Sequence, residues 1–302
     1  MTENLYESLC GITGGERVKV NEPMKNHTTF RIGGNADYFV TPDTKEELQQ
    51  ILQLLNREQV PFFILGNGSN LLVSDAGYRG VVLQIGRNYR SMKKKGCRIR
   101  VKAGITMAGL AAFALENSLT GLEFASGIPG TAGGGAIMNA GAYGSEMKDV
   151  LLEVLCMDRQ GELLTLAGEE MELSYRDSRM KREQLIVLEL LLELKEGDQD
   201  AIRLRQEELK EARTSKQPLE YPSAGSTFKR PEGTFAGKLI MDAGLKGYQI
   251  GGARVSEKHA GFVINAGGAT AADVKALMEH IVKTVQDQFG VTLEPEVLFL
   301  GE

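Results

Sequence analysis

Two glycine-rich segments give this sequence its clearest capacity to bind an anion. One is Gly66-Asn-Gly-Ser-Asn70, and the other begins Gly127-Ile-Pro-Gly-Thr-Ala-Gly-Gly-Gly-Ala136 and continues to Gly144. Such backbone can present successive N–H groups to a phosphate with no side chain in the way. Two of these segments, with Ser and Asn donors interleaved, favour a pyrophosphate between them, as in a dinucleotide. Tight structural turns are the alternative explanation.

Three short polar clusters could supply acids, bases and cations. They are Ser174-Tyr-Arg-Asp-Ser178, Ala224-Gly-Ser-Thr-Phe-Lys-Arg-Pro231 and Leu293-Glu-Pro-Glu-Val297. Taken singly, each also fits a turn, a helix cap or a solvated strand end. Taken together, they bring a guanidinium, a hydroxyl group and carboxylates, which are groups used in proton transfer and anion binding.

Several common sites are not indicated. No GxGxxG follows a strand, and neither GxxxxGK[ST] nor GxSxG occurs. The three histidines form no HExxH, and the three cysteines form no CxxC pair. These six residues are His27, His259, His280, Cys10, Cys97 and Cys156. We therefore expect no metal site and no disulfide framework.

Composition limits the partners. The chain has 302 residues and a formal net charge of -5, so no global basic field exists for nucleic acid. No apolar run is long enough to span a bilayer. The polar, acidic segment Met1–Cys10 is unlike a secretory signal. We expect a cytoplasmic protein that binds neither membrane nor nucleic acid.

The elements that must position these groups are a mixture of strands and helices. Apolar periodicity predicts the helices Thr44–Asn56 and Thr270–Phe289, and composition predicts an Ala-rich helix at Thr106–Asn117 and a charged helix at Asp198–Lys216. Thr44 with Glu47, and Thr270 with Asp273, form capping-box pairs. A buried strand, Pro61–Leu65, leads into the first glycine segment, and Leu293–Leu300 closes the chain as a strand. Strands and helices do not alternate regularly, so the pattern favours an α+β fold over a doubly wound sheet.

Seven motifs, in order, resemble the UDP-N-acetylenolpyruvoylglucosamine reductase family, and the resemblance covers about Lys19 to Leu300. The motifs are Asn26-His-Thr-Thr-Phe-Arg-Ile-Gly-Gly34, Leu65-Gly-Asn-Gly-Ser-Asn70, Gly127–Ala136, Asn139-Ala-Gly-Ala-Tyr-Gly144, Tyr175-Arg-Asp-Ser178, Ala224-Gly-Ser226 and Glu294-Pro-Glu296.

The resemblance implies a fold and a reaction. The fold is an FAD-binding cradle of the vanillyl-alcohol-oxidase type plus a smaller α+β substrate domain, with subdomains 1–80 and 81–200 and a substrate domain 201–302. The reaction is NADPH-dependent reduction, through FAD, of the enolpyruvyl ether of UDP-N-acetylglucosamine to UDP-N-acetylmuramate for peptidoglycan synthesis. FAD is bound non-covalently in this family, which argues against His27 as a covalent attachment point. A monomer is expected.

The resemblance also assigns catalytic roles. Arg176 resembles the arginine that holds the substrate carboxylate, and Glu296 its partner, which must be protonated to help a developing anion. Ser226 resembles the proton donor to carbon. An alcohol is a weak acid, so a nearby cation such as Lys229 must favour its transient alkoxide.

Binding residues follow by the same comparison. The expected cofactor-binding residues are Gly66, Asn67, Gly68, Ser69, Asn70, Ile128, Pro129, Gly130, Gly133, Gly134, Asn139, Gly141, Ala142 and Tyr143. The expected substrate-binding residues are Tyr175, Lys216, Lys229, Arg230 and His259.

The chain departs from part of the family. The interval from Arg176 to Ser226 is short and has no tyrosine-bearing insertion, so the chain resembles the branch without that loop. His259 stands where the other branch has an amide. Two other functions remain open: a flavin oxidase of the same cradle, and a non-catalytic nucleotide-sugar or flavin-binding protein.

Overall fold

The computed structural model describes residues 3–301. Its α-helices are α1 (Glu3–Thr13), α2 (Lys45–Arg57), α3 (Met107–Glu116), α4 (Ala132–Ile137), α5 (Arg179–Arg182), α6 (Gln199–Lys216), α7 (Ala236–Asp242) and α8 (Ala271–Phe289).

Strands make up most of the remaining regular structure. They are β1 (Val18–Pro23), β2 (Asn35–Val40), β3 (Phe62–Leu65), β4 (Leu71–Val73), β5 (Tyr78–Gln84), β6 (Met92–Lys95), β7 (Arg98–Lys102), β8 (Leu119–Thr120), β9 (Gly141–Ala142), β10 (Ser145–Glu146), β11 (Leu151–Met157), β12 (Leu163–Ala167), β13 (Ile186–Glu193), β14 (Lys195–Glu196), β15 (Gln249–Ile250), β16 (Ala253–Val255), β17 (Val263–Asn265) and β18 (Leu298–Leu300).

The strands form mostly antiparallel sheets. The largest has the order β12-β11-β13-β7-β6, and a four-stranded sheet has the order β1-β2-β5-β3. The pairs β3–β5 and β4–β18 are parallel. Mixed pairing without regular βαβ units agrees with the expected α+β class.

The chain divides into two compact units. The first contains Met1–Lys19, Tyr38–Asn67 and Gly80–Arg213, and the second contains Val20–Asp37, Gly68–Arg79 and Thr214–Glu302. The division at Arg213 falls in the last turn of α6.

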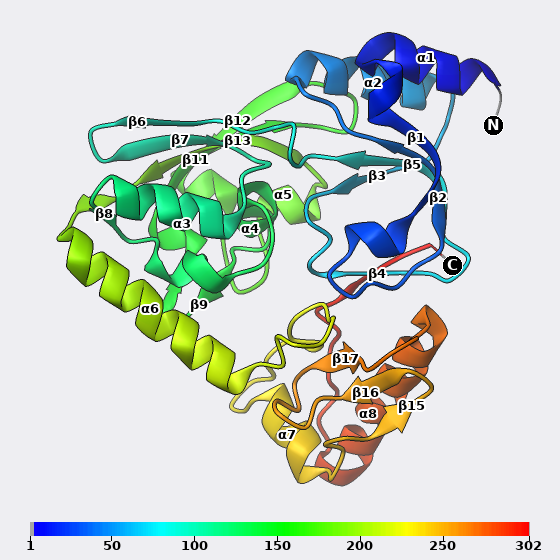
Figure 1. The fold of residues 1–302 in the computed structure, drawn as a ribbon, viewed down its shortest axis with the longest axis vertical. Helices are drawn as coiled ribbons and strands as arrows, with labels where there is room; N and C mark the ends of the chain where they lie inside the picture. Colours follow the sequence, from blue (N-terminus) through cyan, green and yellow to red (C-terminus); the bar gives the residue numbers. More distant parts are fainter. Residues whose placement is uncertain (1–2, 302) are drawn as a thin grey trace. The chain divides into compact units, whose positions relative to one another are not determined.

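Helices cover the sheets of the first unit. Figure 1 shows α3, α4 and α5 on one side of the five-stranded sheet, and α1 lying beside α2. The apolar face of α2, which includes Leu48, Ile51 and Leu52, is fully buried. It packs in one core with the strand residues Val81 and Leu83. Burial of these faces holds the glycine segments on a rigid support.

The second unit is built around α8. This helix contacts β15 and β16, and α7 contacts α8 (Figure 1). The expected inward residues of α8 are all buried: Val274, Leu277, Met278, Ile281 and Val285. Its capping box is also confirmed, because Thr270 accepts a hydrogen bond from the Asp273 N–H and Asp273 accepts one from the Thr270 N–H.

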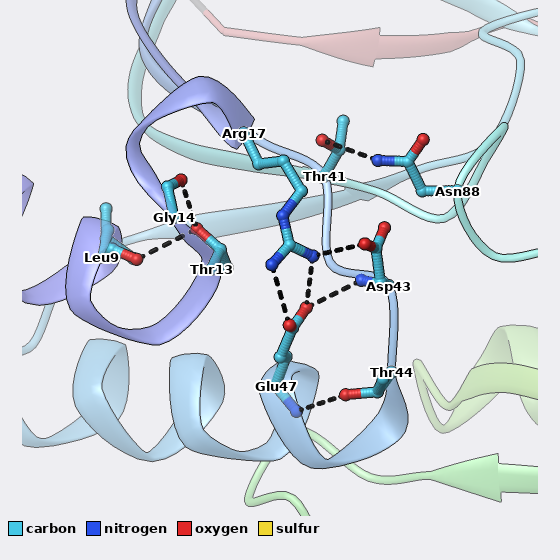
Figure 2. Close-up of polar contacts among 9 residues, drawn as sticks. All are labelled: Leu9, Thr13, Gly14, Arg17, Thr41, Asp43, Thr44, Glu47 and Asn88. Atoms are coloured by element: carbon cyan, nitrogen blue, oxygen red, sulfur yellow. Dashed lines mark hydrogen bonds and ion pairs between the residues drawn. The ribbon is translucent and has the colours of Figure 1, made fainter.

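An ionic network fixes the start of α2 (Figure 2). Thr44 accepts a hydrogen bond from the Glu47 N–H, as expected. The Glu47 carboxylate accepts two hydrogen bonds from Arg17, at 2.8 and 2.9 Å, and one from the Asp43 N–H at 2.8 Å. A backbone hydrogen bond from Thr44 also helps to lower the pKa of Glu47. The predicted pairing of Thr44 with Glu47 is thus supplemented by a guanidinium from a distant segment, which binds the same carboxylate.

Three further expectations need correction. The last strand is short: it comprises only Leu298–Leu300, which pairs with Leu71–Val73, and the residues before it contribute one isolated bridge. The segment before it contains Pro295, which has no N–H for a ladder. The second glycine segment is not all loop, since Ala132–Ile137 is helical. His280, expected on the surface, is half-buried and stacks on Tyr248 with ring centroids 4.4 Å apart.

Candidate functional site

The first glycine segment is fixed by close backbone packing. Gly68 has φ +60°, and a Cβ there would lie 2.1 Å from the His27 carbonyl oxygen. The Thr29 N–H donates to the Gly68 carbonyl at 3.2 Å. The His27 ring is 2.7 Å from a carboxylate oxygen of Glu22. Contact with the Asn26–Gly34 motif therefore requires glycine at position 68.

The second glycine segment contains a short helix. Thr131 caps α4 by accepting a hydrogen bond from the Gly134 N–H. A Cβ on Gly133 would lie 2.7 Å from Ala103 Cβ, and one on Gly135 would lie 2.6 Å from Met107 Sδ. Helix packing, rather than a loop, explains these two glycines.

The end of this segment is a tight hairpin. β9 pairs with β10, and the intervening Tyr143 and Gly144 have φ +56° and +88°. Two positive φ values are what a type I′ turn requires. The Tyr143 hydroxyl donates to the Leu209 carbonyl of α6 at 3.2 Å. Gly144 is therefore explained by a tight structural turn.

Within the first unit the two glycine segments meet. A Cβ on Gly66 would lie 2.8 Å from Thr131 Oγ1, and Gln84 Nε2 donates to the Gly66 carbonyl at 3.1 Å. The Gly133 N–H already donates to the Ala103 carbonyl at 3.0 Å. A phosphate at this meeting point would therefore have to be bound by other amides of the two segments.

The structure adds Arg213, which motif comparison missed, to the candidate residues. Its Cδ lies 3.0 Å from the position of a Cβ on Gly127. Burial lowers the pKa of Arg213 below its ordinary value, and nearby Tyr143 acts weakly in the opposite direction. Among residues 3–301 no carboxylate forms an ion pair with this guanidinium. A partly desolvated cation beside a glycine segment suits an anionic ligand. The helix pattern of α6 gave no signal for it, because Arg213 is one of many charges there.

Arg176 lies at the apex of a tight turn. The Ser174 N–H donates to the Asp177 carbonyl at 3.0 Å, and the Asp177 N–H returns a bond to the Ser174 carbonyl at 3.3 Å. Arg176 has φ +56°, and its guanidinium lies 5.6 Å from the ring centroid of Tyr175, which is 55% exposed. A left-handed arginine is rare and is a recognised feature of functional sites.

Asn139 and Ser178 hold this turn. The Asn139 amide donates to the Ser174 carbonyl at 3.1 Å and accepts from the Lys148 N–H at 2.9 Å. Ser178 Oγ donates to the Ile137 carbonyl at 2.7 Å. Asn139 is expected to bind the cofactor, and its side-chain bonds connect the end of α4 to the Arg176 turn.

In the second unit, Ser226 and Glu296 lie on two chain segments that are bonded together. Phe228 bridges Pro295, and the Glu296 N–H donates to the Thr227 carbonyl at 2.9 Å. Thr227 is 1% exposed, and its hydroxyl accepts from the Val263 N–H at 2.8 Å. Ser226 is exposed and Glu296 is half-buried. A buried threonine thus anchors the two candidates next to each other.

The expected substrate cations differ in their surroundings. Lys229 Nζ lies 2.9 Å from a carboxylate oxygen of Glu294. Arg230 lies over the Phe235 ring at 4.0 Å from the centroid. Lys216 is the exposed last residue of α6. The charge of Lys229 is therefore partly balanced by Glu294, which lies on the segment bridged to its own.

His259 is enclosed by two glycines. The Gly261 N–H donates to His259 Nδ1 at 3.1 Å, and Cβ atoms on Gly237 and Gly261 would lie 3.3 and 3.0 Å from its Cε1. Burial lowers the pKa of His259, with a further contribution from Lys246. Because Nδ1 accepts, the neutral ring carries its proton on Nε2 and is a donor there.

Two general observations complete the site. Across residues 3–301, no cluster of three or more His, Cys, Asp or Glu side chains could hold a metal ion. None of the helices in the same range is long and apolar enough to cross a membrane.

Arg176 belongs to the first unit, and Ser226 and Glu296 belong to the second.

Comparisons with known proteins agree with these features. Residues 217–300 match the family model "UDP-N-acetylenolpyruvoylglucosamine reductase, C-terminal domain", and residues 36–167 match "FAD binding domain". A solved 4-ethylphenol oxidase from Gulosibacter chungangensis, 16% identical, covers 64% of this chain and 42% of its own with a TM-score of 0.50. At that identity the likeness concerns the fold alone, which is of the expected FAD-cradle type.

Closer relatives cover the whole chain. The UDP-N-acetylenolpyruvoylglucosamine reductase of Caldanaerobacter subterraneus is 51% identical over 100% of both chains. That of Geobacillus thermodenitrificans is 51% identical over 99% of this chain and 98% of its own. The crystal structure of the Thermus caldophilus enzyme, 35% identical, covers 94% of this chain and 98% of its own with a TM-score of 0.80. On this identity over its full length, the chain belongs to the UDP-N-acetylenolpyruvoylglucosamine reductase family.

Proposed function

We propose that this chain reduces the enolpyruvyl ether of UDP-N-acetylglucosamine-enolpyruvate to UDP-N-acetylmuramate, with roles for individual residues as follows. Membership of the family, together with the FAD binding domain, makes it an FAD-dependent oxidoreductase of peptidoglycan synthesis with NADPH as reductant. Bound FAD would supply the hydride-transfer chemistry that links NADPH to the terminal carbon of the enolpyruvyl group.

The residues present fit a dinucleotide cofactor. In the first unit Gly66 lies against Thr131, where a Cβ would be 2.8 Å from the threonine hydroxyl oxygen. Arg213 supplies a partly buried cation beside Gly127. Glycine amides and a guanidinium are the groups that bind phosphates. We assign the pyrophosphate to amides of the two segments other than those of Ala132, Gly133, Gly134 and Gly135, which donate within the protein.

Arg176 is assigned to the substrate carboxylate. Hydride addition leaves charge on the neighbouring carbon, and this charge spreads into the carboxylate as an enolate. A guanidinium can bind both carboxylate oxygens at once and holds its charge at any physiological pH. The turn fixed by Ser174 and Asp177 presents Arg176 from a rigid apex, which limits the reorganisation needed during reaction.

Ser226 is assigned to proton donation and Glu296 to support of the developing anion. The hydroxyl proton moves to the carbon next to the carboxylate, and the resulting alkoxide regains a proton from solvent. Glu296 is held beside the Ser226 segment by the bond from its N–H to the Thr227 carbonyl. A protonated carboxyl group there would donate to the enolate. The ion pair of Lys229 with Glu294 means that Lys229 supports the alkoxide less than a lone cation would.

Substrate binding is assigned to Tyr175, Lys216, Arg230 and His259. The neutral Nε2–H of His259 is a hydrogen-bond donor without charge, which suits a carbonyl or hydroxyl oxygen. The two cations suit the diphosphate.

The observation that carries these residue roles is the pairing of the Ser226 and Glu296 segments through Thr227 and Phe228. Its test is Ser226→Ala. Flavin reduction by NADPH should stay within about twofold of wild type, and reoxidation by the enolpyruvyl substrate should slow by about 10²- to 10⁴-fold.

A matched control is Ser91→Ala, which changes an exposed serine of the first unit. Both half-reactions should be unaffected in it. Equal loss of the two half-reactions in Ser226→Ala would contradict the role of this residue.

The proposal also covers the localisation, the oligomeric state and the domain division of the protein. We assign the protein to the cytoplasm as a monomer, and we keep the division into two FAD subdomains and one substrate domain. Size-exclusion chromatography with light scattering tests the monomer, and a dimer mass would overturn it.

A further inference from the structure

We propose that Asn70, the last residue of the first glycine segment, is a positioning residue for Glu296. The motif alone suggests a cofactor ligand at this place. The hydrogen bonds of its side chain and carbonyl suggest a different task, which rests on the role proposed above for Glu296.

Asn70 binds the chain on both sides of Val297. Its Nδ2 donates to the Glu296 carbonyl at 2.9 Å, and its own carbonyl accepts from the Leu298 N–H at 3.0 Å. The parallel pairing of Leu71–Val73 with Leu298–Leu300 begins directly after this contact. Asn70 is thus the first link between β4 and the segment that carries Glu296.

The backbone N–H and the backbone carbonyl of Glu296 are consequently both hydrogen-bonded. Its N–H donates to the Thr227 carbonyl, and its C=O accepts from Asn70. Without the Asn70 amide, the Glu296 carbonyl would lose this hydrogen bond. The side chain could then move with its backbone, and displacement of a catalytic group by about 1 Å can cost about 100-fold in rate.

The bonds of Asn70 also make a phosphate role less suitable. One of its two amide hydrogens is committed to Glu296, and its Oδ1 is an acceptor that a phosphate would repel. Asn70 and Glu296 lie 226 positions apart in the sequence, and both belong to the second unit. The contact between them therefore lies wholly within that unit.

The test is Asn70→Ala in the FAD-loaded enzyme, alone and combined with Glu296→Gln. We expect FAD affinity and flavin reduction by NADPH within about threefold of wild type. We expect reoxidation by the enolpyruvyl substrate to slow by about 10- to 100-fold. In the Glu296→Gln background the same change should slow reoxidation by less than about twofold, because the group it positions is already disabled.

The control is Asn35→Ala, which removes an exposed amide bond to Asn21 in the same unit and should leave both half-reactions unchanged. If Asn70→Ala does not fold, Asn70→Asp removes the same donor at nearly constant volume. Thermal unfolding identifies which variants are folded.

Two results would overturn the proposal: loss of FAD affinity with an unchanged reoxidation rate in the loaded enzyme, or equal slowing by Asn70→Ala in both backgrounds. Failure of the proposed function is separately visible, since wild-type enzyme would then not be reoxidised by the enolpyruvyl substrate at all.

Discussion

At the scale of single residues, Arg176 combines backbone strain with a proposed catalytic role. It adopts φ +56° at a turn apex. A non-glycine residue there costs about 1 kcal/mol, and glycine relieves that cost. Such strain is retained where a particular side chain is needed.

Two truncations separate strain from function. Arg176→Gly and Arg176→Ala remove the same side chain, so both should lose substrate turnover to a similar degree. The glycine variant should be more stable than the alanine variant by about 1 kcal/mol in urea unfolding. Equal stabilities, or a turnover that survives in either variant, would contradict this view of the turn.

His259 gives a second residue-scale prediction. Burial, with Lys246, lowers its pKa below the ordinary value of 6.5. Protonation therefore favours the unfolded chain, and the stability contributed by the neutral ring declines as pH falls below 6.5. Nitrogen NMR of the histidine rings should show a titration midpoint below 6.5 and the Nε2–H tautomer. A midpoint above 6.5, or an Nδ1–H tautomer, would contradict the proposal that neutral His259 donates a hydrogen bond from Nε2.

At the scale of elements, the Arg17 network secures the start of α2 (Figure 2). Burial alone would raise the pKa of Glu47, but hydrogen bonds from Arg17 and from the backbone N–H of Asp43 hold it below its ordinary value. A lowered folded-state pKa means that the stabilisation is present above the unfolded pKa and is lost as pH falls through the folded pKa.

The corresponding variant is Glu47→Gln. It should cost about 1 kcal/mol of unfolding free energy at pH 7 and should flatten the loss of stability below pH 4.5. Glu58→Gln, at an exposed pair with Arg57, is the control and should change little. Urea unfolding across pH measures both; an unchanged acid limb in Glu47→Gln would show that the network is not the cause.

Local chemistry predicted some elements well and others poorly. The long helices followed from apolar periodicity or, for α6, from a composition rich in charged helix formers. The Thr270 box was confirmed because both of its partners are local. The added partner of Glu47 could not be predicted, since Arg17 lies 30 residues away and no local pattern reveals it. Glycine disfavours helices, so α4 could not be expected; its packing against Ala103 and Met107 outweighs that preference.

At the scale of the whole molecule, family, fold class and cofactor could be predicted, because seven motifs in order carry that information. Arg213 could not, because its burial depends on where the chain folds around Gly127. The family motifs suggested that Asn70 and Asn139 both bind the cofactor. Their hydrogen bonds, to Glu296 and to Ser174, are visible only when segments distant in sequence meet.

The central claim concerns the reaction itself, and an anaerobic visible spectrum tests it most directly. The purified protein reconstituted with FAD should be yellow, lose its colour on addition of NADPH, and regain it when UDP-N-acetylglucosamine-enolpyruvate is added. A flavin that bleaches with NADPH but regains its colour only with oxygen would contradict the account.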